Sequence, residues 1–324
     1  MKTGFNGHFS AEITVAFGEA SAALARAEER LALFPEPDVL VARIRLAEQS
    51  ALAWLEGELL IPDQLAVDYG FSPRAWRRWP FAFVRAFDRP LNRDRLPDAH
   101  SVGQWLSGSA GPAPPALADQ PIPIHEDRLA AWEQRTTPLA RLPRLIAGAD
   151  LAAAFARTAP LGFGNLVIGA MLADRHCLPN SRLSAGGIAA IGFQQRHTSW
   201  LSLVSGALED DFDAISETAR DERCRRAWLD ALTAGAQTAI GLDKRLRIWL
   251  VQLEAACQGT RKSSHLKRLA LLAGRGPSLT VTRAARDLRI SRQAATRLVA
   301  QACERHLLRE ITHGNAFRRY VITA

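Results

Sequence analysis

The C-terminal stretch, residues 260–324, is the part of the sequence that most constrains the fold. The run GRGP at 274–277 ends one apolar-periodic segment, and a second begins near Thr280 with apolar side chains spaced along one helix face. Ser291 is expected to N-cap a third segment, because its hydroxyl can accept from the backbone N–H of residue 293 or 294. Two β-like runs, 307–311 and 317–322, flank a turn at His313-Gly314-Asn315. The stretch therefore predicts three helices followed by a β-hairpin.

This order is that of a winged helix-turn-helix, a small DNA-binding module whose third helix enters the major groove. The apolar residues of the third segment leave polar side chains on the outer side of its first half, where Arg and Gln suit guanine and adenine edges. Arginines of the turn and of the hairpin wing are placed to reach phosphates or a minor groove. The predicted DNA contacts are Arg289, Arg292, Gln293, Thr296, Arg297, Arg318 and Arg319.

Charge is distributed unevenly along the chain. The formal net charge is +8, yet residues 260–324 hold 14 of the 41 Lys and Arg residues and only three of the 33 acids. The first 259 residues are therefore slightly acidic. A basic segment gains from binding a polyanion, because condensed counterions are released. Double-stranded DNA is the expected partner of this segment, and a protein–protein role of the module is the alternative.

The rest of the chain predicts a mainly helical body. Ala, Leu and Arg are abundant, whereas strand formers come in short runs. A Gly/Pro/Ala-rich linker at 107–123 separates an N-terminal helical region, 1–106, from a helical core, 124–259, and the C-terminal module takes 260–324. Helices are expected at 11–33, 38–59, 125–136, 138–158, 164–176, 199–219, 222–239 and 241–258.

The run 159–170 (APLGFGNLVIGA) is a Pro/Gly turn that leads into an apolar helix. Free backbone N–H groups and the helix dipole can bind an anion at such a place. Glycine and asparagine here are equally explained by the geometry of the turn alone. Both interpretations stay open at the level of sequence.

The same run resembles the signature of Fic-type proteins, H-P-F-x-[DE]-G-N-G-R-x-x-R, which Pro160, Gly164 and Asn165 match. In that family a histidine takes the proton from the target hydroxyl, an acid binds the metal, and arginines hold nucleotide phosphates. The positions of that histidine, acid and first arginine hold Ala159, Phe163 and Val167. Because none of these side chains can take a proton, bind Mg²⁺ or hold a phosphate, the departures imply that nucleotidyl transfer is lost.

A second part of the resemblance lies upstream. Fic-type proteins often carry a helix with an S/T-x-x-x-E-[GN] inhibitory motif, and Glu56-Gly57 keeps its last two residues, with Leu52 at the Ser/Thr position. The run 227–240 resembles the helix that follows the Fic core, and many Fic-type proteins end in a winged helix. The resemblance implies a Fic-like helical body with a small C-terminal winged helix-turn-helix, as in helix-turn-helix-tailed proteins of rhizobia-like bacteria.

These patterns favour a sequence-specific DNA-binding protein, a transcriptional regulator whose catalytically inactive body serves dimerisation or binds a partner or small ligand. The alternatives are a Fic-type AMP or nucleotidyl transferase with a divergent site, and an antitoxin-like partner of a Fic enzyme. No cofactor or metal is expected, since the four cysteines are scattered and form no CxxC pair. No apolar run approaches the length of about 18 residues that a membrane span needs, so a cytoplasmic protein is expected. DNA binding implies that it is nucleoid-associated, and a homodimer is expected because a single winged helix would bind weakly.

Overall fold

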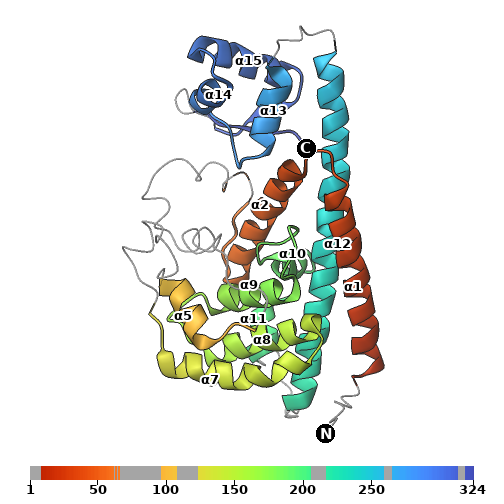
Figure 1. Ribbon diagram of the computed structural model, residues 1–324, viewed down its shortest axis with the longest axis vertical. Coiled ribbons are helices and arrows are strands. Elements are labelled where there is room, and N and C mark those ends of the chain that lie inside the picture. Colours follow the sequence, from red (N-terminus) through yellow and green to blue (C-terminus); the bar gives the residue numbers. More distant parts are fainter. Residues whose placement is uncertain are drawn as a thin grey trace.

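The computed structural model describes residues 9–61, 63, 65, 96–107, 123–205, 217–258, 265–312 and 318–324. Within these residues the chain is mainly α-helical, and its only sheet has two strands (Figure 1). The predicted mainly helical class is therefore confirmed. The predicted linker lies outside the described residues apart from its two ends, and so does the predicted hairpin turn at 313–315.

The body is built along α12 (Glu217–Cys257), a helix of 41 residues that spans the length of the molecule (Figure 1). Helix α1 (Ala11–Ala32) packs beside it in the same direction. Glu12 pairs with Arg226 at one end, at 3.6 Å, and Arg30 pairs with the buried Asp243 further along, at 3.2 Å.

The prediction of separate helices at 222–239 and 241–258 is wrong, because α12 runs through Gly241 without a break. A single glycine inside a helix costs only about 1 kcal/mol relative to alanine. Residues buried on both sides of Gly241, such as Leu232 and Leu246, hold the helix against the body.

Helix α10 (Ile188–Gln195) lies between α12 and α2 (Pro37–Leu55) and contacts both. The backbones of α10 and α12 approach each other closely. A Cβ atom on Gly192 would overlap the carbonyl oxygen of Ala231, and one on Gly235 would overlap that of Ile188. No helix was predicted at 188–195, because its residues are nearly all apolar and show no periodicity.

The remaining helices of the body form a layer beside α12. They are α5 (Ala99–Ser107), α7 (Glu126–Thr136), the 3₁₀ turn η2 (Thr137–Arg141), α8 (Arg144–Thr158), α9 (Asn165–Cys177) and α11 (Trp200–Ser205). Large aromatic side chains fill this layer. Trp132 and Phe155 meet edge to face at 5.3 Å, and Phe193 lies 5.0 Å from Trp200 and 6.0 Å from Trp228.

Three predicted boundaries need correction. The helix expected at 138–158 begins at Arg144, because Pro143 serves as its N-cap and follows a 3₁₀ turn. The helix expected at 38–59 ends at Leu55, and Gly57 takes a left-handed φ of 85° two residues later. Of the helix expected at 199–219, the structure describes α11 at one end and places 217–219 in α12 at the other, while 206–216 lie outside the described residues.

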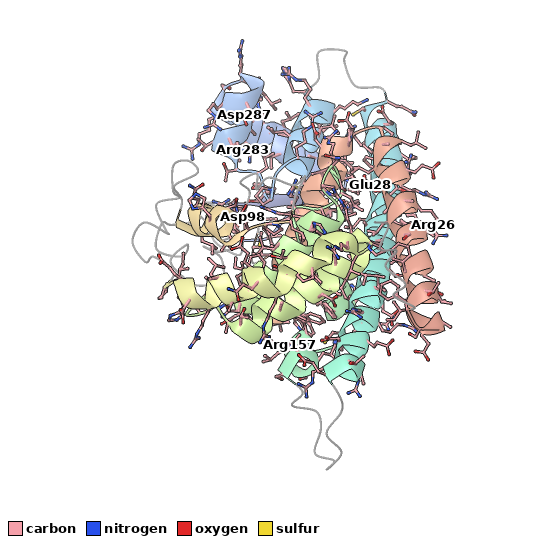
Figure 2. All side chains as sticks on the ribbon, turned by 60° about the horizontal axis from the view of Figure 1, so that its bottom comes forward. Arg26, Glu28, Asp98, Arg157, Arg283 and Asp287 are labelled. Atoms are coloured by element: carbon pink, nitrogen blue, oxygen red, sulfur yellow. The ribbon has the colours of Figure 1, made fainter. Side chains whose placement is uncertain are left out.

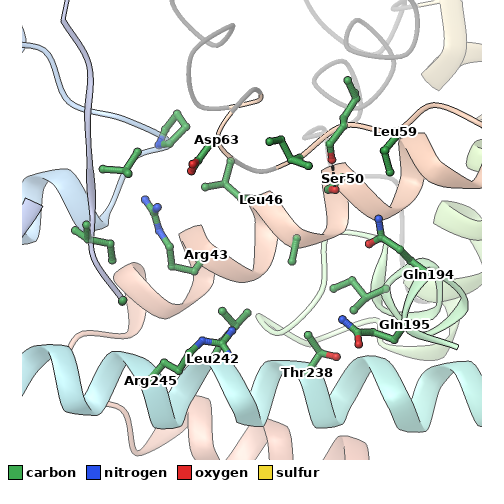
Figure 3. A pocket seen from close by; sticks show the side chains of 18 of the residues that line it. Arg43, Leu46, Ser50, Leu59, Asp63, Gln194, Gln195, Thr238, Leu242 and Arg245 are labelled. Atoms are coloured by element: carbon green, nitrogen blue, oxygen red, sulfur yellow. Dashed lines mark hydrogen bonds between the residues drawn. The ribbon is translucent and has the colours of Figure 1, made fainter. Parts of the chain in front are cut away.

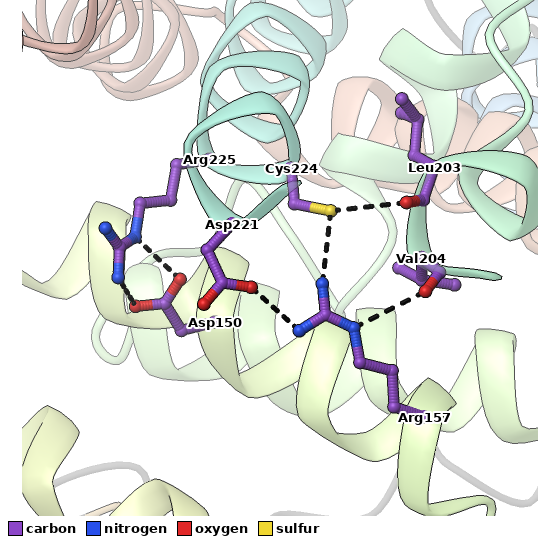
Figure 4. Close-up of polar contacts among 7 residues, drawn as sticks. All are labelled: Asp150, Arg157, Leu203, Val204, Asp221, Cys224 and Arg225. Carbon is purple, nitrogen blue, oxygen red and sulfur yellow. Dashed lines mark hydrogen bonds and ion pairs between the residues drawn. The ribbon is translucent and has the colours of Figure 1, made fainter. Parts of the chain in front are cut away.

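Two arginine–carboxylate pairs fasten α8 to the first turns of α12 (Figure 4). Arg225 donates to both oxygens of Asp150, each at 2.8 Å. Arg157 donates to Asp221 at 2.7 Å and to the carbonyl oxygen of Val204 at 3.4 Å. The second pair therefore also holds the C-terminal end of α11.

Two buried carboxyls hold the start of α10. Glu48 accepts from the backbone N–H groups of Ala185 and Gly187, both at 3.0 Å, and Asp174 accepts from that of Ala189 at 3.1 Å. Burial raises the pKa of Asp174 to about 8 and also raises the pKa of Glu48. These carboxyls satisfy donors at a helix N-terminus that would otherwise have no partner in the core.

The C-terminal unit contains α13 (Leu266–Gly274), α14 (Val281–Leu288), α15 (Arg292–Glu304), β1 (Leu308–Glu310) and β2 (Tyr320–Ile322). The strands pair antiparallel with Leu308 opposite Ile322, and Leu279 bridges to Tyr320. The predicted cap is confirmed, since Ser291 accepts from the N–H of Ala294 at 3.1 Å.

The unit rests on the body through α13, which packs on α2 and α12. One guanidinium nitrogen of Arg43 donates to the carbonyl oxygens of Ala273, Gly274 and Gly276 at the end of α13. The indole of Trp249 on α12 donates to the carbonyl oxygen of Leu307 at 3.1 Å. Helix α15 lies at the outer end of the molecule (Figure 1).

Candidate functional site

The outer side of α15 presents four polar side chains on its first half. Arg292, Gln293, Thr296 and Arg297 are all exposed. The opposite side of the same helix is buried through Ala295, Val299 and Ala302. The helical period that places small apolar residues inward therefore places the predicted base-contacting residues outward together.

The arginines on and near this surface differ in whether they form ion pairs. Arg292 and Arg297 have no ion-pair partner among the described residues. On α14, Asp287 pairs with Arg283 at 3.3 Å and with Arg286 at 2.8 Å. Figure 2 labels Asp287 and Arg283 on this helix. These two pairs cancel part of the positive charge of α14, so the surface of α15 keeps the stronger attraction for an anion.

Arg289 ends α14 in the left-handed region, with φ 56°. This conformation turns the chain tightly into Ser291, and the Arg289 side chain is exposed. The residue therefore lies in the turn before α15, as its predicted role requires.

Both arginines of the predicted wing interact with other side chains of the protein, which the sequence did not indicate. Arg318 lies 3.6 Å from Glu310, and Arg319 donates to the hydroxyl of Ser278 at 3.0 Å. Arg319 is also half-buried, whereas Arg318 is exposed. Contact of either guanidinium with a phosphate would compete with these bonds.

The loop 159–165 is shaped by two left-handed residues, Ala159 with φ 43° and Gly164 with φ 80°. The side chain of Asn165 closes the loop, because it accepts from the N–H of Leu161 at 3.0 Å and donates to the carbonyl oxygen of Leu161 at 2.9 Å. Asn165 is thus used for turn geometry, one of the two interpretations that the sequence left open.

A carboxylate from far upstream occupies the N-terminus of α9. One oxygen of Glu56 accepts from the backbone N–H groups of Leu166 and Val167, at 3.0 and 3.4 Å. Burial raises the pKa of Glu56, while the two N–H bonds oppose that rise. Two of the N–H groups that an outside anion could have used are therefore already occupied by Glu56. Gly57, the second residue of the inhibitory-like pair, is exposed.

The Fic-like positions offer little chemistry. Val167 is fully buried in α9, and Phe163 is half-buried against the core. Ala159 lies in the turn, where Arg128 donates to its carbonyl oxygen at 3.3 Å. In the described part of the chain, no three His, Cys, Asp or Glu side chains gather closely enough to hold a metal ion. Neither Ala159 nor Phe163 carries a group that titrates or binds a cation.

The structure contains a cleft between the body and the C-terminal unit that was not predicted from the sequence. Its volume is about 530 Å³, and its lining comes from α2, α10, α12, β1 and β2 (Figure 3). These segments are far apart along the chain and contain no recognisable motif. No local signal could have brought them together.

No protein-family model matches the chain, and no curated protein matches it in sequence. Among the described residues, no helix combines the length and the apolar composition that crossing a membrane requires.

Proposed function

We propose that this chain is a sequence-specific DNA-binding protein, a transcriptional regulator whose C-terminal unit acts as a winged helix-turn-helix. The observation that carries the proposal is the outer side of α15, where Arg292, Gln293, Thr296 and Arg297 are exposed together. Arginine can bond bidentately to guanine and glutamine to adenine in a major groove. The first half of the helix is the part that reaches base edges in this motif.

The order of elements and the charge support the same proposal. Two helices joined by a tight turn at Arg289 precede a two-stranded antiparallel pair, as in a winged helix. The unit also holds most of the basic excess of the chain. Phosphate contacts by such a surface position the module, while α15 supplies the selectivity.

The body is proposed to be a catalytically inactive, Fic-like scaffold that brings two copies together. Glu56 supports the inactive state, because its carboxylate occupies the N–H groups of α9 that a phosphate would need. One winged helix contacts few base pairs, so two copies would bind a two-fold symmetric site with better affinity.

The test uses DNA sites selected by the full-length protein from a random pool. We expect Arg292→Ala with Arg297→Ala to weaken binding by about 1–3 kcal/mol for each base left without its arginine. The selected sites should be palindromic, and affinity should fall steeply with salt because counterions are released. Fluorescence anisotropy with a selected duplex measures both effects.

The matched control removes two exposed positive charges from the body, with Arg26→Ala and Lys244→Ala. It should leave the affinity within about twofold, since these side chains lie outside the proposed surface. Equal binding by the α15 double variant and the control would sink the proposal. Circular dichroism of each variant checks that the helices are retained.

Nucleotidyl transfer is the competing activity. Incubation with labelled ATP and Mg²⁺ should leave this protein and any co-purified partner unlabelled. Transfer of label to either one would contradict the inactive body, and a stable complex with a Fic-type enzyme would favour the antitoxin-like alternative.

A further inference from the structure

The cleft between the body and the C-terminal unit has two walls of different origin (Figure 3). The body supplies side chains of α2, α10 and α12. The C-terminal unit supplies Pro277, Arg309 of β1, and the last residues of the chain from Val321 onward. A molecule in this cleft would therefore contact both parts at once.

Positive charge dominates the side chains that line the cleft. They include three arginines, Arg43, Arg245 and Arg309, and one carboxylate, Asp63. Asp63 is engaged by Arg309, since both of its oxygens lie 2.8 Å from one guanidinium nitrogen. Arg245 is exposed and has no hydrogen-bond or ion-pair partner among the described residues. An anion can therefore bind Arg245 without displacing an existing carboxylate.

Arg43 adds a second guanidinium to the same end of the cleft. Its Nε is buried and has no hydrogen-bond partner among the described residues, although a terminal nitrogen bonds the end of α13. Figure 3 shows Arg43 and Arg245 toward one end of the cleft.

The other end carries neutral polar groups. Gln194 and Gln195 of α10 make no side-chain hydrogen bond among the described residues. The hydroxyl of Thr238 donates to the carbonyl oxygen of Ala234 at 3.0 Å and keeps its lone pairs available. Figure 3 shows these three side chains gathered opposite the arginines.

The lining also has apolar side chains, among them Leu46, Ile191 and Leu242 beside the more exposed Leu59 and Ile61. Leu46 and Ile191 are buried from solvent by the body. An apolar lining with a few polar groups at fixed places is the usual make-up of a small-molecule site.

We propose that this cleft binds a small amphipathic organic anion, a carboxylate with an apolar part. The carboxylate is held by Arg245 and Arg43, and the apolar part covers Leu242 and the exposed side chains of Leu59 and Ile61. Because the anion bridges the body and the C-terminal unit, it changes how firmly the unit is held. The consequence for DNA affinity rests on the proposed function, whereas the binding itself does not.

The binding test uses 1-anilinonaphthalene-8-sulfonate as a fluorescent amphipathic anion, titrated into the full chain without DNA. Octanoate and benzoate should displace it, while octanamide and acetate, which lack the charge or the apolar part, should do so at least about tenfold less well. Arg245→Gln should weaken octanoate binding by about tenfold, and the effect on octanamide should be small.

Lys244→Gln is the matched control. Lys244 carries the same charge as Arg245 and precedes it in the sequence, but its side chain does not line the cleft. It should bind octanoate like the unaltered protein. The proposal is overturned if octanoate and benzoate fail to displace the dye, if acetate displaces it equally well, or if Arg245→Gln and Lys244→Gln behave alike.

A second titration measures a selected DNA duplex with and without octanoate. A shift in DNA affinity that Arg245→Gln removes supports coupling between the cleft and the C-terminal unit. An unchanged affinity overturns the coupling only. Loss of DNA binding in every condition counts against the proposed function and leaves the dye titration valid.

Discussion

At the scale of single residues, buried carboxyls in this chain stabilise helix N-termini that belong to other parts of the sequence. Asp174 on α9 accepts a hydrogen bond from the N–H of Ala189 at the start of α10. Glu48 on α2 accepts from the N–H of Ala185, just before α10 begins. Glu56 does the same for α9. Each carboxyl group replaces water as the partner of backbone donors, where an unpaired buried donor would be costly.

The raised pKa of Asp174, about 8 in the folded protein against 3.8 for the free side chain, makes stability depend on pH. Between these values the folded state holds a proton that the unfolded state has lost, so the free energy of unfolding falls as pH rises. We expect a loss of about 1 kcal/mol between pH 7 and pH 8, measured by urea denaturation.

Asp174→Asn is the variant that checks this assignment, because its amide oxygen can still accept from Ala189. It should lose most of the pH dependence between pH 7 and pH 8 while keeping the fold. His176 acts in the opposite direction below pH 7, since burial lowers its pKa to about 4 and keeps it neutral in the folded state, whereas the free imidazole with its ordinary pKa of 6.5 is partly protonated there. Between pH 7 and pH 8 the free imidazole is mostly neutral, so the effect of His176 is small. A variant with the same slope as the unaltered protein would assign the dependence elsewhere.

At the scale of elements, the fold depends on how closely α10 approaches α12. Gly192 and Gly235 face the carbonyl oxygens of the opposite helix, so that any Cβ there would overlap backbone. Helices that touch through glycine cannot separate slightly without losing the packing of the whole interface.

We expect Gly192→Ala to lower the free energy of unfolding by more than about 2 kcal/mol, because backbone atoms must move to admit one methyl group. Gly18→Ala in α1 is the matched control. It also lies inside a helix, but its Cβ would meet nothing within 4 Å. There the same change should stabilise the protein by about 0.5–1 kcal/mol, through helix propensity. Thermal and urea denaturation of both variants provide the comparison.

At the scale of the whole molecule, side-chain contacts hold the C-terminal unit against the body. Arg43, Trp249 and the pair of Asp63 with Arg309 join it to the body at separate points. A unit fixed in this way presents α15 in one orientation relative to the body. Two copies joined through their bodies would then fix the spacing of two DNA half-sites.

We expect Arg43→Met to loosen this docking by about 1–3 kcal/mol, because three carbonyl oxygens at the end of α13 lose their donor. Amide hydrogen exchange should accelerate in α13 and β2 but not in α8 and α9. Arg26→Met, at an exposed position on α1, should change neither region. Uniform acceleration across the chain would mean that Arg43 supports global stability instead of the docking.

The sequence by itself determined the local structure. The Thr280 and Ser291 caps, the GRGP stop and the inward face of α15 follow from residues within four positions of one another. Such interactions are encoded by spacing alone, so the predicted mainly helical class and the exposed residues of α15 could be read directly from it.

Only the tertiary structure decided which remote residues meet. It brought Glu56 to the N-terminus of α9 and placed the unpredicted α10 against α12. It also formed a cleft from residues scattered along the chain from Arg43 to Ala324. Contacts of this kind depend on the packing of whole helices, and their partners lie too far apart along the chain for periodicity or capping to indicate them. The sequence therefore specified the helices and their polar faces, while packing decided which of those faces remained available to other molecules.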